Sequence, residues 1–250
     1  MRQRLVLTLT LAVSTFALAQ NIETPRFDIY AGYQYTRVGI GAAQDGLNAL
    51  TDPFNLPRID LGRSLNLNGG NASFQENINS WFGGIVDFSG SMTNKKVDLS
   101  KQAQALGLVA PGTTVTAGFK PTLYTITGGP QFTYRKHEHF QPFARVLLGV
   151  ARANLAPNST TSAAIDSFTT SLALPHFNTT RNSFAWMGGA GTDYVLKRWL
   201  ALRASVDYQR TYLFSGIKVP IPGNPDFHLP DEHQGNFRIS AGVSFRLHPW

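Results

Sequence analysis

Alternation of apolar and polar residues with a period of two constrains this chain more than any other feature of its sequence. It is cleanest near the C-terminal end, where six apolar residues share one parity: Phe237, Ile239, Ala241, Val243, Phe245 and Leu247. The residues between them are polar or small: Arg238, Ser240, Gly242, Ser244 and Arg246. Because successive side chains of an extended strand point to opposite faces, this segment predicts a strand with one apolar and one polar face.

The same alternation marks seven segments of the chain and, less clearly, an eighth. The seven clear segments cover residues 27–36, 82–92, 124–135, 144–150, 184–196, 200–212 and 237–247. In the eighth, residues 65–77, Leu65 and Leu67 have one parity, whereas Ala72 and Phe74 have the other. A β-bulge at Gly69-Gly70 would shift the phase by one residue. The alternative is a loop over 65–70 and a shorter strand from residue 71.

The connections between these segments alternate in length. Residues 77–80, 136–139 and 197–199 form short connections, whereas 39–63, 94–121, 156–182 and 215–236 are each more than twenty residues long. Short turns at one end and long loops at the other are typical of outer-membrane barrels. The pattern therefore predicts an all-β fold, an eight-stranded antiparallel transmembrane β-barrel with short periplasmic turns and four long extracellular loops.

The N-terminal segment has the layout of a secretory signal peptide. Arg2 and Arg4 precede an apolar run from Leu5 to Leu18, and small residues surround a predicted cleavage point after Ala19. We therefore expect a signal peptide over residues 1–19 and a single barrel domain over residues 20–250. The chain contains no cysteine, which excludes disulfides, thiolate nucleophiles and cysteine-based metal sites.

Two further patterns favour a barrel in lipid over a soluble sandwich or barrel, which would show the same alternation. Aromatic residues such as Phe27, Tyr124 and Trp186 gather near the ends of the apolar faces, where membrane interfaces favour them. The opposite faces carry nine charges of both signs: Asp28, Asp87, Arg135, Arg145, Asp193, Arg203, Asp207, Arg238 and Arg246. Eight strands leave an interior just wide enough for side chains, so we expect these charges to pair inside it.

Four stretches carry a resemblance to a known family: 66–73 (NLNGGNAS), 81–90 (WFGGIVDFSG), 128–135 (GGPQFTYR) and 236–243 (NFRISAGV). In order and spacing they resemble the small OmpA/OmpX-type outer-membrane β-barrel domain proteins, a porin-like family of Gram-negative cell envelopes. The resemblance implies insertion by the outer-membrane assembly machinery, which recognises an aromatic-ended last strand. Here that strand would end at Phe245-Arg246-Leu247, and Trp250 would be either a displaced terminal aromatic or an additional interface anchor.

Candidate chemistry is sparse, and we predict no catalytic, cofactor-binding or metal-binding residues. His137 and His139 flank Glu138 on a predicted tight turn, and two imidazoles with one carboxylate form only a weak metal signal. His228, Asp231, Glu232 and His233 share one long loop, where solvated polar residues are the commoner arrangement. Lipid A-modifying barrel enzymes use Ser and His at the rim. His176 with Ser171 or Ser183 is the nearest such pair here, without a third group to orient it.

The expected partners follow from charge and location. The net charge of +7 includes Arg2 and Arg4 and is spread along the chain, so we expect no nucleic-acid binding and favour contact with anionic lipid headgroups. Lys95, Lys96, Lys101 and Lys120 lie in or beside the second long loop and could contact lipopolysaccharide phosphates or serve only solubility. Outer-membrane lipids and the assembly machinery are the expected partners of a monomer.

The function that these patterns favour is structural: a non-enzymatic barrel that displays its loops as an interaction surface. The alternative is a narrow porin passing ions or very small solutes through the charged interior. A lipid A-modifying enzyme is a distant third. Nine charges inside so narrow a barrel favour a blocked interior over an open one.

Overall fold

The computed structural model describes residues 24–52, 55–157, 180–213 and 234–249, so the predicted signal peptide lies outside the described residues. Eight strands form the barrel: β1 (Pro25–Gly39), β2 (Ser64–Asn77), β3 (Phe82–Met92), β5 (Thr116–Thr133), β6 (Phe140–Pro157), β7 (Thr180–Lys197), β8 (Leu200–Thr211) and β9 (Gln234–Pro249). A short strand, β4 (Lys95–Asp98), and two helices, α2 (Gly41–Thr51) and α3 (Ser100–Ala105), lie beyond the barrel.

The eight strands close into a single antiparallel sheet. Each barrel strand pairs with the next one along the chain, β1 pairs with β9, and β3 pairs with β5. Strand β4 pairs only with the start of β5 and so lengthens the sheet beyond the barrel. The predicted eight-stranded antiparallel barrel is confirmed, and closure removes the open edges that lipid would not tolerate.

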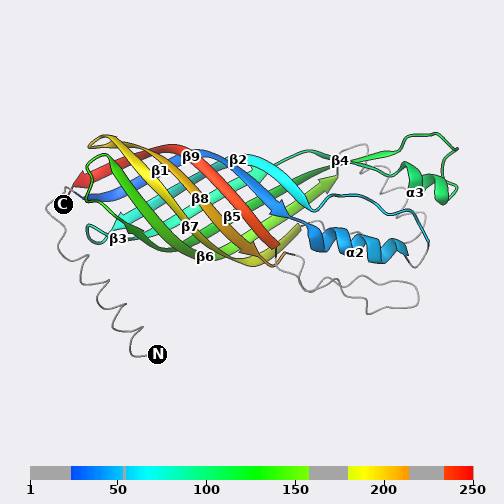
Figure 1. Ribbon diagram of the computed structural model, residues 1–250, viewed down its shortest axis with the longest axis horizontal. Coiled ribbons are helices and arrows are strands. Elements are labelled where there is room, and N and C mark those ends of the chain that lie inside the picture. Colours follow the sequence, from blue (N-terminus) through cyan, green and yellow to red (C-terminus); the bar gives the residue numbers. More distant parts are fainter. Residues whose placement is uncertain (1–23, 53–54, 158–179, 214–233, 250) are drawn as a thin grey trace, which may run out of the picture.

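The two ends of the barrel differ in their connections. At one end, here called the turn end, lie the short connections 78–81, 134–139 and 198–199, with the start of β1 and the end of β9. At the other, the loop end, β4, α2 and α3 project away along the barrel axis (Figure 1). No helix in the described part of the chain is long and apolar enough to cross a membrane.

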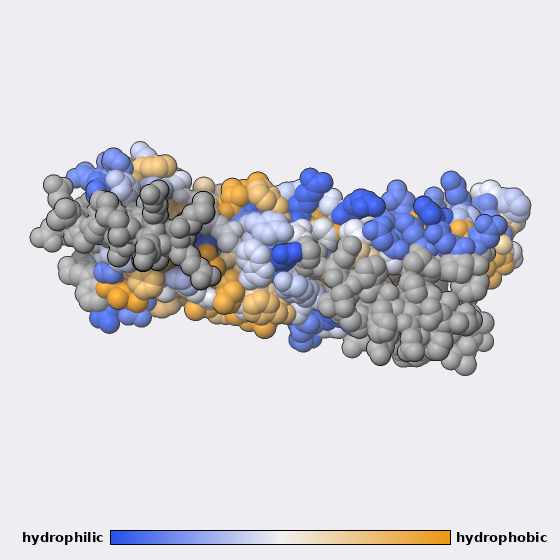
Figure 2. Space-filling model, turned by 60° about the horizontal axis from the view of Figure 1, so that its bottom comes forward, coloured by the Kyte–Doolittle hydropathy of each residue, from blue (hydrophilic) through white to orange (hydrophobic). Residues whose placement is uncertain are grey.

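The outward face of the barrel is apolar. On β6, for example, Val146, Leu148 and Val150 are each more than half exposed, whereas the intervening Leu147 is fully buried. Figure 2 shows apolar side chains gathered over the middle of the barrel on the face in view, and we call these outward residues, which include Val146 and Leu148, the apolar band. Aromatic rings lie near both ends of this band: Trp199 stacks on Phe245 at the turn end, and Trp186 meets Tyr208 edge-on nearer the loop end.

The eighth strand differs from both sequence-based alternatives. Strand β2 pairs with β1 without a shift in register from Ser64 to Glu76, so neither a bulge at Gly69-Gly70 nor a loop over 65–70 is correct. A Cβ on Gly69 would collide with the carbonyl oxygen of Gly90 on β3. This glycine therefore permits a close approach of two strands. The change in apolar parity arises instead because Leu67 faces the interior and is buried, whereas Phe74 faces outward and is exposed.

The two described loops contain more structure than the alternation indicates. The first long loop holds α2, and the second holds β4 and α3. Strand β5 begins at Thr116, eight residues before the start of its predicted segment, because its first residues pair with β4. Most of the third and fourth predicted loops, 156–182 and 215–236, lies outside the described residues.

Candidate functional site

All nine predicted interior charges project into the barrel, and each residue is at most 8% exposed. We call this set the ionic core: Asp28, Asp87, Arg135, Arg145, Asp193, Arg203, Asp207, Arg238 and Arg246. Each comes from the polar face of its strand or, for Arg135, from the turn after β5. The ionic core has three levels between the turn end and the middle of the barrel.

The level nearest the middle of the barrel, here called the middle ring, consists of two arginines and two aspartates. Arg145 donates from Nε and Nη2 to the two carboxylate oxygens of Asp207 at 2.9 and 2.8 Å. Arg238 donates from Nε to Oδ2 of Asp207 at 3.0 Å and from Nη1 to Oδ1 of Asp87 at 2.7 Å. Arg145 Nη1 lies 4.0 Å from Asp87 Oδ2 and completes the ring. Since β9 and β3 are separated by β1 and β2 in the sheet, the Arg238–Asp87 bond crosses the interior.

The second level is the pair of Arg203 and Asp193. The guanidinium donates from Nε and Nη2 to the carboxylate at 2.7 and 2.8 Å, a bidentate geometry. Its central carbon lies 5.0 Å from the ring centre of Phe143 and 5.6 Å from that of Tyr30. Arg203 also reaches Gln75 on β2 at 3.5 Å. These contacts fill the barrel between β8 and the opposite strands.

The third level closes the turn end. Asp28 Oδ1 lies 3.6 Å from Arg246 Nε, and Asp28 Oδ2 lies 3.8 Å from Arg135 Nη2. Asn77 links the two sides, because it donates to Asp28 at 2.7 Å and accepts from Arg135 at 2.8 Å. Arg246 donates to Gln141 at 2.9 Å. Charges buried in this way are tolerated only when paired and hydrogen-bonded, so the three levels hold one another in place.

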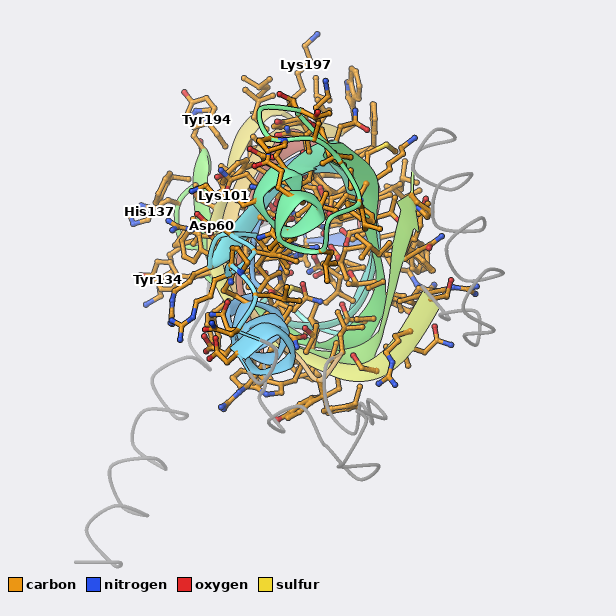
Figure 3. All side chains as sticks on the ribbon, turned by 90° about the vertical axis from the view of Figure 1, so that its right-hand side faces the viewer. Asp60, Lys101, Tyr134, His137, Tyr194 and Lys197 are labelled. Atoms are coloured by element: carbon orange, nitrogen blue, oxygen red, sulfur yellow. The ribbon has the colours of Figure 1, made fainter. Side chains whose placement is uncertain are left out.

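Between the ionic core and the loop end, the interior holds buried polar side chains, such as Gln209 and Asn236, beside an apolar cluster. Seven buried residues form a cluster at the loop end, here called the apolar cap: Val38, Ile40, Leu67, Leu123, Ala151, Ala185 and Leu213. Leu61 and Leu65 pack against it from the first loop and the start of β2. Seen along the axis, side chains crowd the ring of strands (Figure 3). Alternation alone does not predict the apolar cap. The change of apolar parity at Leu65 and Leu67 is the one sequence feature that indicates apolar residues on the inner face there.

Two buried glutamines tie the described loops together. Gln44 of α2 donates to the carbonyl of Ile59 at 2.7 Å and accepts from the backbone N–H of Leu61 at 2.6 Å. Gln102 of α3 donates to the carbonyls of Pro57 and Arg58 at 2.9 and 3.0 Å. The first and second loops therefore form one folded extension beyond the barrel.

The remaining predicted candidates are dispersed. Lys95 and Lys96 lie on β4, Lys101 on α3 and Lys120 on β5, all at the loop end. His137 and His139 lie in one turn but contact different tyrosine rings, those of Tyr134 and Tyr194.

Three or more potential metal ligands come together nowhere among the described residues. Ser183 accepts a hydrogen bond from the backbone of Tyr212. The other members of the predicted rim and loop groups, Ser171, His176 and residues 228–233, lie outside the described residues, as does Trp250.

Comparisons with known proteins agree with this geometry. A family model described as the outer membrane protein beta-barrel domain matches residues 5–247. Neisserial surface protein A is similar in structure, with 15% identity over 88% of this chain and 97% of that chain and a TM-score of 0.50.

Two further structures align over comparable lengths. Ail, the attachment invasion locus protein of Yersinia pestis, was solved in complex with the heparin analogue sucrose octasulfate. It gives 17% identity over 89% of this chain and 99% of that chain, with a TM-score of 0.46. OprG from Pseudomonas aeruginosa gives 14% identity over 92% and 99%, with a TM-score of 0.44. No curated protein matches.

Proposed function

Because this chain belongs to the outer membrane protein beta-barrel domain family, we propose that it is a non-conducting barrel whose role is to display its loop end outside the cell. The protein is a small outer-membrane β-barrel, and the proposal places its short turns in the periplasm and its long loops outside the cell. We include in the proposal that it acts without a catalytic site, cofactor or nucleic acid, and as a monomer.

One observation carries this proposal: the interior is crossed by side-chain contacts at several levels. The Arg238–Asp87 bond joins β9 to β3, Gln131 donates to Gln75 across β3 at 2.8 Å, and the apolar cap lies above both. An ion that entered would have to break paired charges in a medium of low dielectric constant and then cross an apolar layer. A barrel of this kind serves as a rigid support, and partner molecules would bind at its loop end.

The loop end also supports a role for lipopolysaccharide as a partner. Lys96 lies on β4 and Lys120 on β5, and both side chains are exposed just beyond the apolar band. Ammonium groups at this height would meet lipid phosphates as point charges.

We extend the proposal to the assembly machinery through Phe245, which is 44% exposed on the outward face of the last strand.

A narrow pore remains the second candidate, favoured by a different observation. The hydroxyl groups of Ser73, Ser91 and Thr127 are buried in the interior without a protein partner among the described residues. Water would satisfy them, because buried polar groups are seldom left unpaired. A chain of such waters along β2, β3 and β5 would provide a wet path beside the ionic core.

Conductance of the refolded protein in planar bilayers separates the two candidates. The proposal predicts no steady single-channel openings for the wild type. Asp207→Ala combined with Leu67→Ala, which breaks the middle ring and leaves a cavity in the apolar cap, should produce openings, whereas the exposed control Arg58→Ala should not. Steady wild-type openings that disappear in Arg203→Ala or Asp207→Ala would overturn the closed barrel in favour of the pore.

A further inference from the structure

An uncharged, mostly apolar segment lies exposed at the extreme loop end. Residues 105–112, with the sequence ALGLVAPG, begin at the last residue of α3, and we call them the apolar tip. Leu106 and Leu108 are 53% and 60% exposed. In Figure 1 the chain just after α3 lies farthest from the turn end, and Figure 2 shows apolar atoms at that extremity among hydrophilic ones. Leu106 and Leu108 therefore form a small exposed apolar surface outside the apolar band.

The backbone holds the apolar tip in one conformation. Gly107 has a φ of 69°, its N–H bonds the carbonyl of Gln104 at 3.0 Å, and the N–H of Leu108 bonds that of Ala103 at 2.9 Å. This pair of bonds is the Schellman motif that ends helices at a glycine. Since Gln102 anchors α3 to the first loop, the leucines are presented outward on a fixed support instead of folding back onto the barrel.

The charges behind the apolar tip are mainly positive. The second loop carries Lys95, Lys96 and Lys101 against a single acid, Asp98. Asp98 accepts hydrogen bonds from the backbone and hydroxyl of Ser100, which lower the pKa of its carboxyl group and keep it ionised. Residues 93–115, between β3 and β5, therefore carry a net charge of +2. Lys101 projects from α3 in the view along the axis (Figure 3).

Two of the three acidic groups of the first loop are paired with arginines, and the third, Asp60, accepts a hydrogen bond from the backbone N–H of Gly62. Asp52 forms a bidentate pair with Arg58 at 3.1 Å, and Asp45 lies 3.4 Å from Arg63. The extension therefore combines a leucine-bearing end with lysines behind it that form no salt bridge within 4.0 Å among the described residues. That combination suits a lipid surface, because apolar side chains enter the acyl region while lysines remain among anionic headgroups.

We propose that the apolar tip inserts into a second, anionic lipid bilayer, one that lies opposite the outer surface of the cell and is separate from the outer membrane that holds the barrel. This inference rests on the proposed display function. The barrel's own bilayer surrounds the apolar band, whereas the apolar tip lies at the opposite end of the extension (Figure 1). A single pair of leucines binds weakly, so attachment depends on many copies in one outer membrane acting together.

Flotation with lipid vesicles tests the inference. Sucrose-loaded phosphatidylcholine vesicles that carry many copies of the full-length protein should float with sucrose-free vesicles containing phosphatidylglycerol and much less with pure phosphatidylcholine vesicles. Replacing both leucines, Leu106→Ser with Leu108→Ser, should weaken binding about tenfold or more. Leu155→Ser is the matched control, because Leu155 is 44% exposed at the end of β6 but outside the apolar tip. Equal binding by the double variant and the wild type would overturn the proposal.

A fluorescent probe supplies a second readout that does not depend on removing the leucines. The chain has no cysteine, so Ala110→Cys introduces a unique site for an environment-sensitive dye. Addition of phosphatidylglycerol vesicles should shift its emission to the blue, and Lys101→Gln should reduce the shift. A dye that responds to a cell-surface protein but not to vesicles would overturn the lipid assignment.

Failure of this inference is distinguishable from failure of the proposed function. Conductance depends on the ionic core and the apolar cap, and vesicle binding depends on the apolar tip. A conducting wild type that still inserts its leucines would refute the closed barrel alone. A non-conducting barrel whose apolar tip does not bind vesicles would refute the inference alone.

Discussion

The ionic core and the apolar cap occupy the same barrel but fill it by different means. In the ionic core, long side chains span the interior and each charge depends on identified partners, as Arg238 does on Asp87 and Asp207. In the apolar cap, short and branched side chains such as Val38, Leu67 and Ala151 fill space without directed bonds. The first arrangement is specific and intolerant of partial loss, whereas the second responds to changes in volume.

The largest effect is expected at Asp207, on which the middle ring depends. Asp207→Ala leaves Arg145 and Arg238 buried without the carboxylate that both contact, which should lower the free energy of unfolding by about 4–5 kcal/mol. Reversible urea unfolding in lipid vesicles measures the change. The exposed acid Asp45, replaced by Ala, is the control. A loss below about 1 kcal/mol at Asp207 would mean that water already compensates the two guanidiniums.

A double-mutant cycle on Arg203 and Asp193 should show how far the ionic core depends on intact pairs. Either Arg203→Met or Asp193→Leu alone should lower stability by about 3 kcal/mol, because each leaves one buried charge. The double variant should lose about 1 kcal/mol or less, since two apolar side chains then replace the pair. Additive losses in the same urea experiment would contradict strong coupling.

Leu67→Ala should test the apolar cap. Removal of a buried leucine leaves a cavity, and we expect a loss of about 2–3 kcal/mol. Conductance should stay absent because the ionic core beneath is intact. Leu67→Met, which nearly conserves volume, should cost less than about 1.5 kcal/mol. A variant that is stable yet conducts would show that the apolar cap, and not the ionic core, closes the barrel.

The smallest effect is expected for the pair of Arg58 and Asp52, which repeats the bidentate geometry of Arg203 and Asp193 in the open. Both side chains are about half exposed or more, so solvent screens the pair and long side chains lose entropy on forming it. Arg58→Ala should leave the urea midpoint unchanged within error. A clear decrease would show that this pair holds the first loop in place.

The sequence predicts the architecture well because lipid and a narrow interior impose opposite demands on alternate residues. In β9, every second residue from Phe237 to Leu247 is apolar, and the inward positions include Arg238 and Arg246. All nine charged residues of the ionic core could be assigned to the inner face by parity alone. Their location needed no knowledge of which strands lie opposite one another.

Parity could not identify the partners or the apolar cap. The bond between Arg238 and Asp87 depends on strand stagger around the whole barrel, which no local pattern encodes. At Leu65 and Leu67 the interior is itself apolar, so the contrast between faces that defines the phase disappears. The helices were missed because α2 contains Gly41 and Gly46 and α3 spans only Ser100–Ala105, which gives little helical periodicity.

The middle ring also bears on the order of assembly. Arg238 and Asp87 are 151 residues apart in sequence, and Arg145 and Asp207 are 62 apart. Arg145 and Asp207 can pair once β6 and β8 are in place, but Arg238 finds its two carboxylates only when β9 joins β3 and β8. Until then its guanidinium must keep its hydration, because a bare guanidinium is strongly disfavoured inside a barrel surrounded by hydrocarbon. Dehydration of the interior and addition of the final strand are therefore one late kinetic event, and a partly assembled barrel stays wet.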